Sequence, residues 1–434
     1  MNPNELMELF KDYINIFNTI YRLHTFDEDK INNIYIEIKT KLIETKIISP
    51  SELVNILSTA SEYNNRYFKS YFAIFKKLFE EYHPNDANSL RNIFNYFIYK
   101  EYGIVLGYAN QNKFKKYESE NYSLEIHEEN TIYRAIMDDD IKSFISFTVQ
   151  GGFDENEELE SYFYPTKENT FLELCCYYGA VNCFKFLRTK YKSEISSSCI
   201  EYSFLGGNPE IMSECLKETR KFYYLMDHAI ISHNIDFVSF LLNEHNMKIN
   251  INLCLRFNNL QAFFVCLDQA DQINECFVNS PFFNMISLCE YFLSHGVDIN
   301  AKDSKHQTAL HYAAEISRIE IAEFLISHGA DINAKSVINY TPLHNAVRSQ
   351  CIEIVKLLIS NGADINKKDK SGLTPLHHAA KEVNGKEIIE FLISHGADIY
   401  VTDNSNKSPL DYAKAFKLKA NEEYPIHLYS HQNV

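Results

Sequence analysis

Apolar residues recur every three or four positions through the first 108 residues, which is the spacing that lines one face of an α-helix. The runs with this spacing are residues 6–21, 31–42, 53–57, 67–79 and 90–98. The aromatic run at 67–79 is more typical of a helical core than of a ligand groove, which is the alternative interpretation. We therefore predict a helical domain of about five helices at residues 1–108.

Local signals mark the ends of these helices. Ser49-Pro50-Ser51-Glu52 has the residue order of a capping box, in which serine and glutamate bond each other's backbone amides. His83-Pro84 ends the aromatic run. Residues 109–125 are polar and charged and interrupt the apolar pattern, so we predict a linker there.

A repeated pattern begins near residue 130 and stays faint as far as residue 274. Its later helical segments start near residues 198, 224, 249 and 275, at steps of 26, 25 and 26. Two short helices and their turns need a length of about this size, so little is left for the loops between them. We predict that residues 126–274 form degenerate short repeats that stack as bare helix pairs.

From residue 275 the repeat becomes regular. The hexapeptide at residues 295–300, His-Gly-Val-Asp-Ile-Asn, returns with small changes at 328–333, 361–366 and 395–400, at steps of 33, 33 and 34. A second phrase, Thr-Pro-Leu-His or a close variant, keeps the same step. Its copies begin at Thr308, Thr341, Thr374 and Ser408.

Each phrase has a physical role at a helix end. Thr341 can cap the free amides of a helix start, and Pro342 suits the first helical position because its missing N–H costs no hydrogen bond there. Gly362 follows an apolar helix and suits the left-handed conformation that ends it. Between these signals we predict a hairpin-like finger, with a residue that tolerates positive φ two positions before each Thr or Ser. These residues are His306, Asn339, Gly372 and Asn406.

The 33-residue period with Thr-Pro-Leu-His at the start of each unit resembles the ankyrin-repeat family, strongly over residues 290–415. The short repeats and Tyr63-Asn64-Asn65-Arg66-Tyr67 resemble a group of unicellular-eukaryote ankyrin proteins, in which a region of unknown function precedes regular repeats. The resemblance implies an all-α solenoid: an N-terminal helical domain, then about ten ankyrin units with short β-hairpin fingers in the C-terminal repeats. Residues 275–420 would be the regular repeats with a C-terminal cap, and residues 421–434 a tail.

Two groups of residues invite a metal-binding interpretation. His311, His344 and His377 recur once per repeat, and the resemblance implies that they bond backbone atoms between repeats instead. Asp138-Asp139-Asp140 falls at a predicted turn between two helices, where a solvated turn is the alternative to a metal site. We predict no metal and no cofactor. The sequence has no phosphate-binding glycine loop, nucleophile elbow or His-Glu-x-x-His motif, so we also predict no enzymatic activity.

Composition narrows the possible partners and compartments. The formal net charge of −16 opposes nucleic-acid binding, which depends on clustered Lys and Arg. No apolar run approaches the roughly 18 residues that span a bilayer, and the polar, acidic start does not resemble a signal peptide. The ten cysteines contain no Cys-x-x-Cys and fit reduced, buried side chains. We predict a cytoplasmic protein without a membrane span, with a nuclear location left open.

A stack of such repeats presents an extended surface for recognition, so we predict a protein–protein interaction scaffold whose protein partner the sequence does not identify. The resemblance implies contacts from the finger tips and the adjoining first helices. These positions are Ser304, Lys305, Gln307, Glu315, Ile316, Val337, Ile338, Tyr340, Arg348, Ser349, Lys370, Ser371, Leu373, Lys381 and Glu382. Val337, Ile338 and Tyr340 stand out as apolar or aromatic tips, for which packing on neighbouring fingers is the alternative.

Other functions stay open at this point. The N-terminal helices could dock on an enzyme complex such as a ubiquitin ligase, with the array selecting the client, or they could self-associate in a structural protein. An enzyme within the helical domain would need a polar cleft, which the aromatic pattern does not indicate. The oligomeric state and the packing of the helical domain on the array also stay open.

Overall fold

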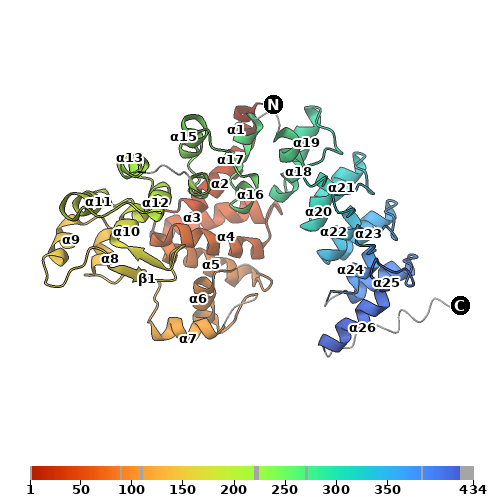
Figure 1. The fold of residues 1–434 in the computed structure, drawn as a ribbon, viewed down its shortest axis with the longest axis horizontal. Coiled ribbons are helices and arrows are strands. Elements are labelled where there is room, and N and C mark those ends of the chain that lie inside the picture. The colour runs from red at the N-terminus through yellow and green to blue at the C-terminus, as the bar shows by residue number, and fades with distance from the viewer. Residues whose placement is uncertain are drawn as a thin grey trace. The chain divides into compact units, whose positions relative to one another are not determined.

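The structure is a computed structural model that describes residues 2–87, 90–107, 111–218, 224–268, 272–382 and 385–420. It divides into two compact units, one of residues 2–265 and one that begins at Cys266 (Figure 1). Both units are predominantly helical, as the sequence predicts. The first unit holds the N-terminal helices together with the short repeats, and the second holds the regular repeats. The predicted tail at 421–434 lies outside the described residues.

The N-terminal region contains one helix more than the periodicity indicated, because the run at 6–21 breaks at Phe10. Its elements are α1 (Pro3–Leu9), α2 (Lys11–Tyr21), α3 (Glu28–Ile38) continued by η1 (Lys39–Ile43), α4 (Pro50–Tyr63), η2 (Asn65–Tyr67), α5 (Phe68–Tyr82) and α6 (Asn92–Tyr102). The predicted capping box opens α4: the Glu52 amide donates to Ser49 Oγ at 3.1 Å, and the Ser49 amide donates to the Glu52 carboxylate at 2.7 Å.

The aromatic run forms core, as predicted. Phe68, Phe72 and Phe75 on α5 are buried and meet Phe94 on α6 edge to face, with ring centroids 5.7, 5.8 and 5.7 Å apart. Such edge-to-face pairs add to the stabilisation that comes from burying the rings. The side chains of the aromatic run are therefore engaged in packing against α6.

The segment expected to be a linker contains a packed helix in its described part. Helix α7 (Gln111–Ser119) is polar in composition, but its two aromatic residues point inward. Phe114 and Tyr117 are buried, and their rings lie 5.9 and 5.6 Å from the ring of Tyr96 on α6. Two buried aromatics in nine residues are enough to dock the helix, and a composition average hides them.

The short repeats form helix pairs whose starts agree closely with the predicted ones. The pairs are α8 (Ile132–Met137) with α9 (Ile141–Thr148), α10 (Phe171–Tyr178) with α11 (Val181–Phe186) and η3 (Leu187–Tyr191), α12 (Ser197–Gly206) with α13 (Pro209–Glu218), α14 (Leu225–Ile231) with α15 (Ile235–His245), and α16 (Ile251–Arg256) with α17 (Leu260–Val265). An unpredicted two-stranded antiparallel sheet, β1 (Glu158–Glu160) and β2 (Glu168–Thr170), lies between the first two pairs, with Leu159 opposite Asn169.

The three consecutive aspartates lie at the turn between α8 and α9, as predicted. Asp138 pairs with Arg134 at 2.6 Å, and Asp140 accepts the first amides of α9. Asp139 accepts the backbone amides of Asn182 and Cys183 at the start of α11, both at 3.0 Å. Each aspartate thus has a structural partner. Among the described residues, no group of three or more His, Cys, Asp or Glu is placed to hold a metal ion.

The N-terminal helices pack on the short repeats, which settles a question that the sequence left open. Phe10 contacts Phe264 on α17, with ring centroids 5.8 Å apart. The ring of Tyr21 stacks on that of His233, in the turn between α14 and α15, at 4.2 Å. Within this unit, α1 to α5 lie against the row of helix pairs (Figure 1).

The regular repeats continue the helix pairs with longer connections. Their elements are η4 (Cys266–Asp268), α18 (Ile273–Asn279), η6 (Ser280–Phe283), α19 (Ile286–Ser294), α20 (Ala309–Glu315), α21 (Ile319–Ser327), α22 (Pro342–Arg348), α23 (Ile352–Ser360), α24 (Pro375–Ala379), α25 (Lys386–Ser394) and α26 (Pro409–Ala420). Gly329, Gly362 and Gly396 follow the second helices with φ of 88°, 91° and 92°, as expected for helix-ending glycines.

All ten cysteines are buried and none is in a disulfide, in agreement with their predicted role as small core residues. No described helix is both long enough and apolar enough to cross a bilayer.

Candidate functional site

A box of one threonine and one histidine begins the first helix of three regular repeats. The amide of Thr308 donates to His311 Nδ1 at 3.1 Å, and His311 Nε2 donates to the Tyr340 carbonyl of the next repeat at 3.0 Å. The same box forms at Thr341 with His344 and at Thr374 with His377. The box caps a helix and ties one repeat to the next, which confirms the role expected of these histidines.

Burial keeps the box histidines neutral. Loss of hydration lowers the pKa of His311 to about 4 and that of His344 to about 4, from the ordinary value of 6.5. Burial lowers the pKa of His377 as well. The neutral ring is the form that the box requires, because Nδ1 accepts a hydrogen bond while Nε2 donates one.

The predicted fingers are four five-residue loops, called here the finger loops: residues 303–307, 336–340, 369–373 and 403–407. In each loop the first amide donates to the last carbonyl, at 2.9 to 3.0 Å. The fourth residue of each loop has positive φ, as predicted. These residues are His306 at 57°, Asn339 at 60°, Gly372 at 78° and Asn406 at 55°.

Backbone hydrogen bonds join each finger loop to the next. The Val337 amide donates to the Lys305 carbonyl at 2.9 Å, and the Lys370 amide donates to the Ile338 carbonyl at 3.0 Å. The Asn404 amide donates to the Ser371 carbonyl at 3.0 Å. The four tips therefore lie side by side in one row whose backbone is held in place, so that side chains on it are preorganised for contact.

The second finger loop has a different base from the other three. Asp303, Asp369 and Asp403 begin the other loops, and their carboxylates bond Tyr312, His378 and Tyr412 from the first helix of the same repeat at 2.7, 3.1 and 2.6 Å. In the second repeat Ser336 replaces the aspartate and Asn345 replaces the aromatic ring. The same loop contains Val337, Ile338 and Tyr340, which are called here the apolar tip.

The structure separates the predicted partner-binding residues by exposure. Those that are exposed are Ser304, Lys305, Glu315, Val337, Ile338, Arg348, Lys370 and Ser371. Those that are half-buried are Gln307, Ile316, Tyr340, Ser349, Lys381 and Glu382. The finger-loop members come together in the row, and the helix members lie at the ends of the first helices.

Two of the predicted contact residues are engaged in packing. Leu373 is only 8% exposed, and its amide donates to Asp369 Oδ1 at 2.9 Å, so it belongs to the base of its loop and not to the surface. The Tyr340 ring stacks on His344 and meets the His378 ring at 5.2 Å, with the Arg348 guanidinium 5.4 Å above it. The residues that project freely from the apolar tip are Val337 and Ile338, 43% and 49% exposed.

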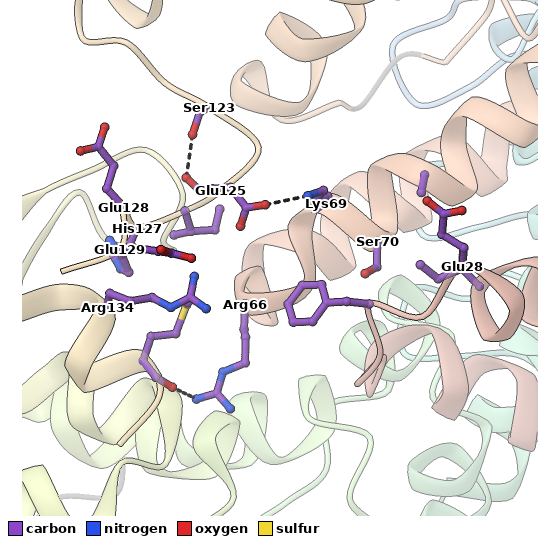
Figure 2. A pocket seen from close by; sticks show the side chains of 15 residues that line it. Glu28, Arg66, Lys69, Ser70, Ser123, Glu125, His127, Glu128, Glu129 and Arg134 are labelled. Atoms are coloured by element: carbon purple, nitrogen blue, oxygen red, sulfur yellow. Dashed lines mark hydrogen bonds and ion pairs between the residues drawn. The ribbon is translucent and has the colours of Figure 1, made fainter. Parts of the chain in front are cut away.

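A second candidate site is an open cavity of about 730 Å³ in the first unit. Arg66 on η2 and Lys69 at the start of α5 lie on one side of it, and Glu125, His127 and Arg134 on the other (Figure 2). Lys69 pairs with Glu125 at 2.7 Å across the cavity, and the Arg66 guanidinium bonds the carbonyls of Met137 and Tyr178. The charged groups of Arg66 and Lys69 are therefore already bonded to other residues of the same chain.

His127, which lines the cavity, also belongs to a buried hydrogen-bond network. His127 Nε2 bonds the Tyr164 hydroxyl at 2.6 Å, Tyr164 bonds the Tyr178 hydroxyl at 2.7 Å, and Tyr178 donates to Asn65 Oδ1 at 2.9 Å. Burial lowers the pKa of His127 to about 3, so the ring is neutral. The Asn65 amide group donates to the Phe163 carbonyl at 3.1 Å. This network joins the N-terminal helices to the first two short repeats.

Comparison with protein families finds three family models that match parts of the chain. A family model described as "Ankyrin repeats (3 copies)" matches residues 280–369, and one described as "Ankyrin repeats (many copies)" matches residues 358–413. The chain is an ankyrin-repeat protein. A third model, "Domain of unknown function (DUF3447)", matches residues 191–266, within the short repeats ahead of the regular ankyrin repeats. No curated protein matches the chain in sequence.

Ankyrin repeats indicate a role in protein–protein interaction in general. The sequence did not reveal the hydrogen-bond network of His127, because the residues of this network come from the distant positions 65, 127, 164 and 178. One signal was available: the Tyr63–Tyr67 motif contains Asn65 and Arg66, both polar and both next to an aromatic run.

Proposed function

We propose that this ankyrin protein is a protein-binding scaffold that holds its partner on the finger loops of its regular repeats. The observation that supports this most is the exposed pair Val337 and Ile338, on a loop whose backbone is bonded to both neighbours. Apolar side chains that are held in water on a rigid loop gain free energy when a partner covers them.

The test uses the full chain with Val337→Ser and Ile338→Ser. Affinity purification with quantitative mass spectrometry should show at least about a tenfold loss of the main partner, because a central apolar anchor commonly contributes 1.4 kcal/mol or more. The melting temperature should stay unchanged, since both side chains are exposed. Unchanged partner capture would contradict the proposal.

A matched control exists in the other unit. Val149 and Ile145, at the end of α9, are also an exposed valine and isoleucine, 69% and 37% exposed. Replacing both with serine removes the same two side-chain types from a surface without finger loops. Partner capture should be retained in this control, and its loss would assign the binding surface to the first unit.

A targeting subunit is a second candidate, supported by the exposed ring of Phe26 at the cavity of the first unit. This ring is 53% exposed beside Tyr67 and could hold part of an enzyme complex such as a ubiquitin ligase. In the same purification, Phe26→Ser should then remove one set of partners and the Val337 and Ile338 variant a different set. A single shared set would argue against two docking surfaces.

A further inference from the structure

Charge is distributed unevenly over the regular repeats, although the whole chain is acidic. The finger loops and the residues next to them carry six exposed lysines. These are Lys302, Lys305, Lys335, Lys368, Lys370 and Lys407. The loop carboxylates are buried at their bases, with Asp303, Asp369 and Asp403 only 6 to 7% exposed and bonded to first-helix side chains.

The second helices of the same repeats have the opposite charge. They carry six exposed glutamates, Glu290, Glu320, Glu323, Glu353, Glu387 and Glu390, against two exposed lysines, Lys356 and Lys386. Both of these lysines lie near carboxylates: Lys356 is 3.3 Å from Glu387, and Lys386 is 4.0 Å from Glu390. The exposed negative charge of these helix pairs therefore lies mainly on the second helices, and the carboxylate of Glu275, which is near the first finger loop, accepts the Ser304 amide at 3.3 Å.

Other exposed carboxylates occur in the turns that follow the second helices, and they are engaged locally. Asp298, Asp331, Asp364 and Asp398 each accept the amide two residues further on, at 2.8 to 3.2 Å. By contrast, Lys305, Lys335 and Lys370 make no ion pair with any carboxylate that the structure describes. Their ammonium groups are available to an incoming anion.

These lysines flank the apolar tip. Lys305 and Lys370 lie in the loops whose backbones bond the amide of Val337 and the carbonyl of Ile338. Lys335 precedes the same loop, and Arg348 lies over Tyr340 at its base. The surface thus consists of an apolar centre surrounded by cations, which is the arrangement of an interface with an apolar core and a charged rim.

We infer that the partner of the finger loops is an acidic peptide segment with an apolar residue that contacts Val337 and Ile338. The inference rests on the proposed function and adds the chemistry of the partner. A surface with cations around an apolar tip selects against basic and neutral segments by charge. Nucleic acid fits less well, because bases and phosphates gain little from two aliphatic side chains and a chain of net charge −16 repels a long polyanion.

The test is a peptide array probed with the full chain. The array holds peptides of about 15 residues in which an aliphatic or aromatic residue is flanked by acidic, neutral or basic residues. Solution affinities for the best binders are measured by fluorescence anisotropy, and a labelled single-stranded oligonucleotide is included. We expect the acidic peptides with a central apolar residue to bind, with affinity that falls as salt increases.

Two matched double variants locate the charge effect. Lys335→Glu with Lys370→Glu should weaken the acidic peptides at least about tenfold, whereas Lys356→Glu with Lys386→Glu on the second helices should change affinity less than about twofold. Circular dichroism verifies that both variants are folded. A preference for neutral or basic peptides, for the oligonucleotide, or an equal effect of the two variants would overturn the inference.

The outcomes also separate this inference from the proposed function. Peptides bound without acidic preference, but lost in the Val337 and Ile338 serine variant, would end the inference and leave the scaffold proposal intact. Binding that responds to neither the charge variants nor the serine variant would end both.

Discussion

The short repeats and the regular repeats stack similar helix pairs but use the ends of those pairs differently. In the short repeats, the turns between paired helices are bonded to the N-terminal helices, as where His233 Nδ1 bonds Asn18 at 2.9 Å and Nε2 bonds the Phe257 carbonyl at 2.8 Å. In the regular repeats, histidine boxes at the starts of the first helices join neighbours directly, and each box directly follows a finger loop. One region is held by a covering layer of helices, and the other by contacts that recur along the chain.

The difference supports the proposal that the binding surface lies on the finger loops. In the short repeats, polar side chains bond the covering helices and are not available to a partner. In the regular repeats, neighbouring repeats are bonded to each other, so the side chains at the loop tips can vary freely. The comparison predicts that damage to the covering layer affects the first unit alone, and that damage to the finger tips affects binding alone.

The largest effect should follow from Asn65→Ala. The change leaves the Phe163 carbonyl and the Tyr178 hydroxyl without their buried partner, which should lower the free energy of unfolding of the first unit by about 2 to 5 kcal/mol. Hydrogen exchange measured by mass spectrometry should become faster across residues 2–265 and should stay unchanged in the finger loops. The exposed Asn32 on α3 gives a control, since Asn32→Ala should change stability by less than about 0.5 kcal/mol.

A smaller loss is expected from Gly206→Ala, which probes the closest approach between short repeats. A Cβ on Gly206 would lie 2.1 Å from the Cys176 carbonyl oxygen and 2.6 Å from the Gly179 nitrogen, so α10 and α12 must separate. Overpacking of this kind costs about 1 to 3 kcal/mol in urea unfolding. A Cβ on Gly151 would meet no atom within 4 Å, so Gly151→Ala should leave the free energy of unfolding nearly unchanged. Equal losses in the two variants would show that the close contact between α10 and α12 is unimportant for stability.

A fall in pH should lower the free energy of unfolding of the regular repeats by an amount comparable to, or smaller than, the loss expected from Gly206→Ala. Burial places the pKa of His311 and His344 at about 4, so between pH 6.5 and 4 the unfolded chain binds protons that the folded chain does not. Stability is therefore present at neutral pH and is lost as pH falls through this window, by about 1 to 2 kcal/mol per histidine at pH 5. His344→Gln should reduce the slope of melting temperature against pH, and an unaltered slope would contradict this cause.

The smallest effect on stability should come from Val337→Ser with Ile338→Ser. Exposed side chains contribute little to folding, so we expect a change below about 0.5 kcal/mol by thermal unfolding. A clear loss of stability would mean that the tips pack on neighbouring loops, which is the alternative interpretation of these residues.

Local signals made most of the regular repeats predictable. Thr308 begins a helix and His306 precedes it at a position that needs positive φ, so these two roles follow from a short stretch of sequence, whereas the role of His311 was implied by the ankyrin resemblance. Leu373 was placed on the surface by register alone, and the structure buries it because an apolar side chain at that position turns toward the loop base. Spacing predicts a position in the repeat but not its exposure.

Long-range polar contacts were not predictable in the same way. Asn65, His127, Tyr164 and Tyr178 form one network, yet none has a spacing that marks it as buried. Helix α7 was missed because a polar composition concealed the two aromatics that dock it. Association of the N-terminal helices with the short repeats depends on such contacts, so it required the structure.

Cross-linking mass spectrometry of the full chain with its captured partner tests the central claim most directly. A lysine-reactive cross-linker compares Lys305, Lys335 and Lys370 at the finger loops with Lys356 and Lys386 on the second helices, all five of them exposed. We predict that cross-links to the partner cluster on the three finger-loop lysines. A cluster on the second helices or on lysines of the first unit would contradict the claim that the finger loops are the binding surface.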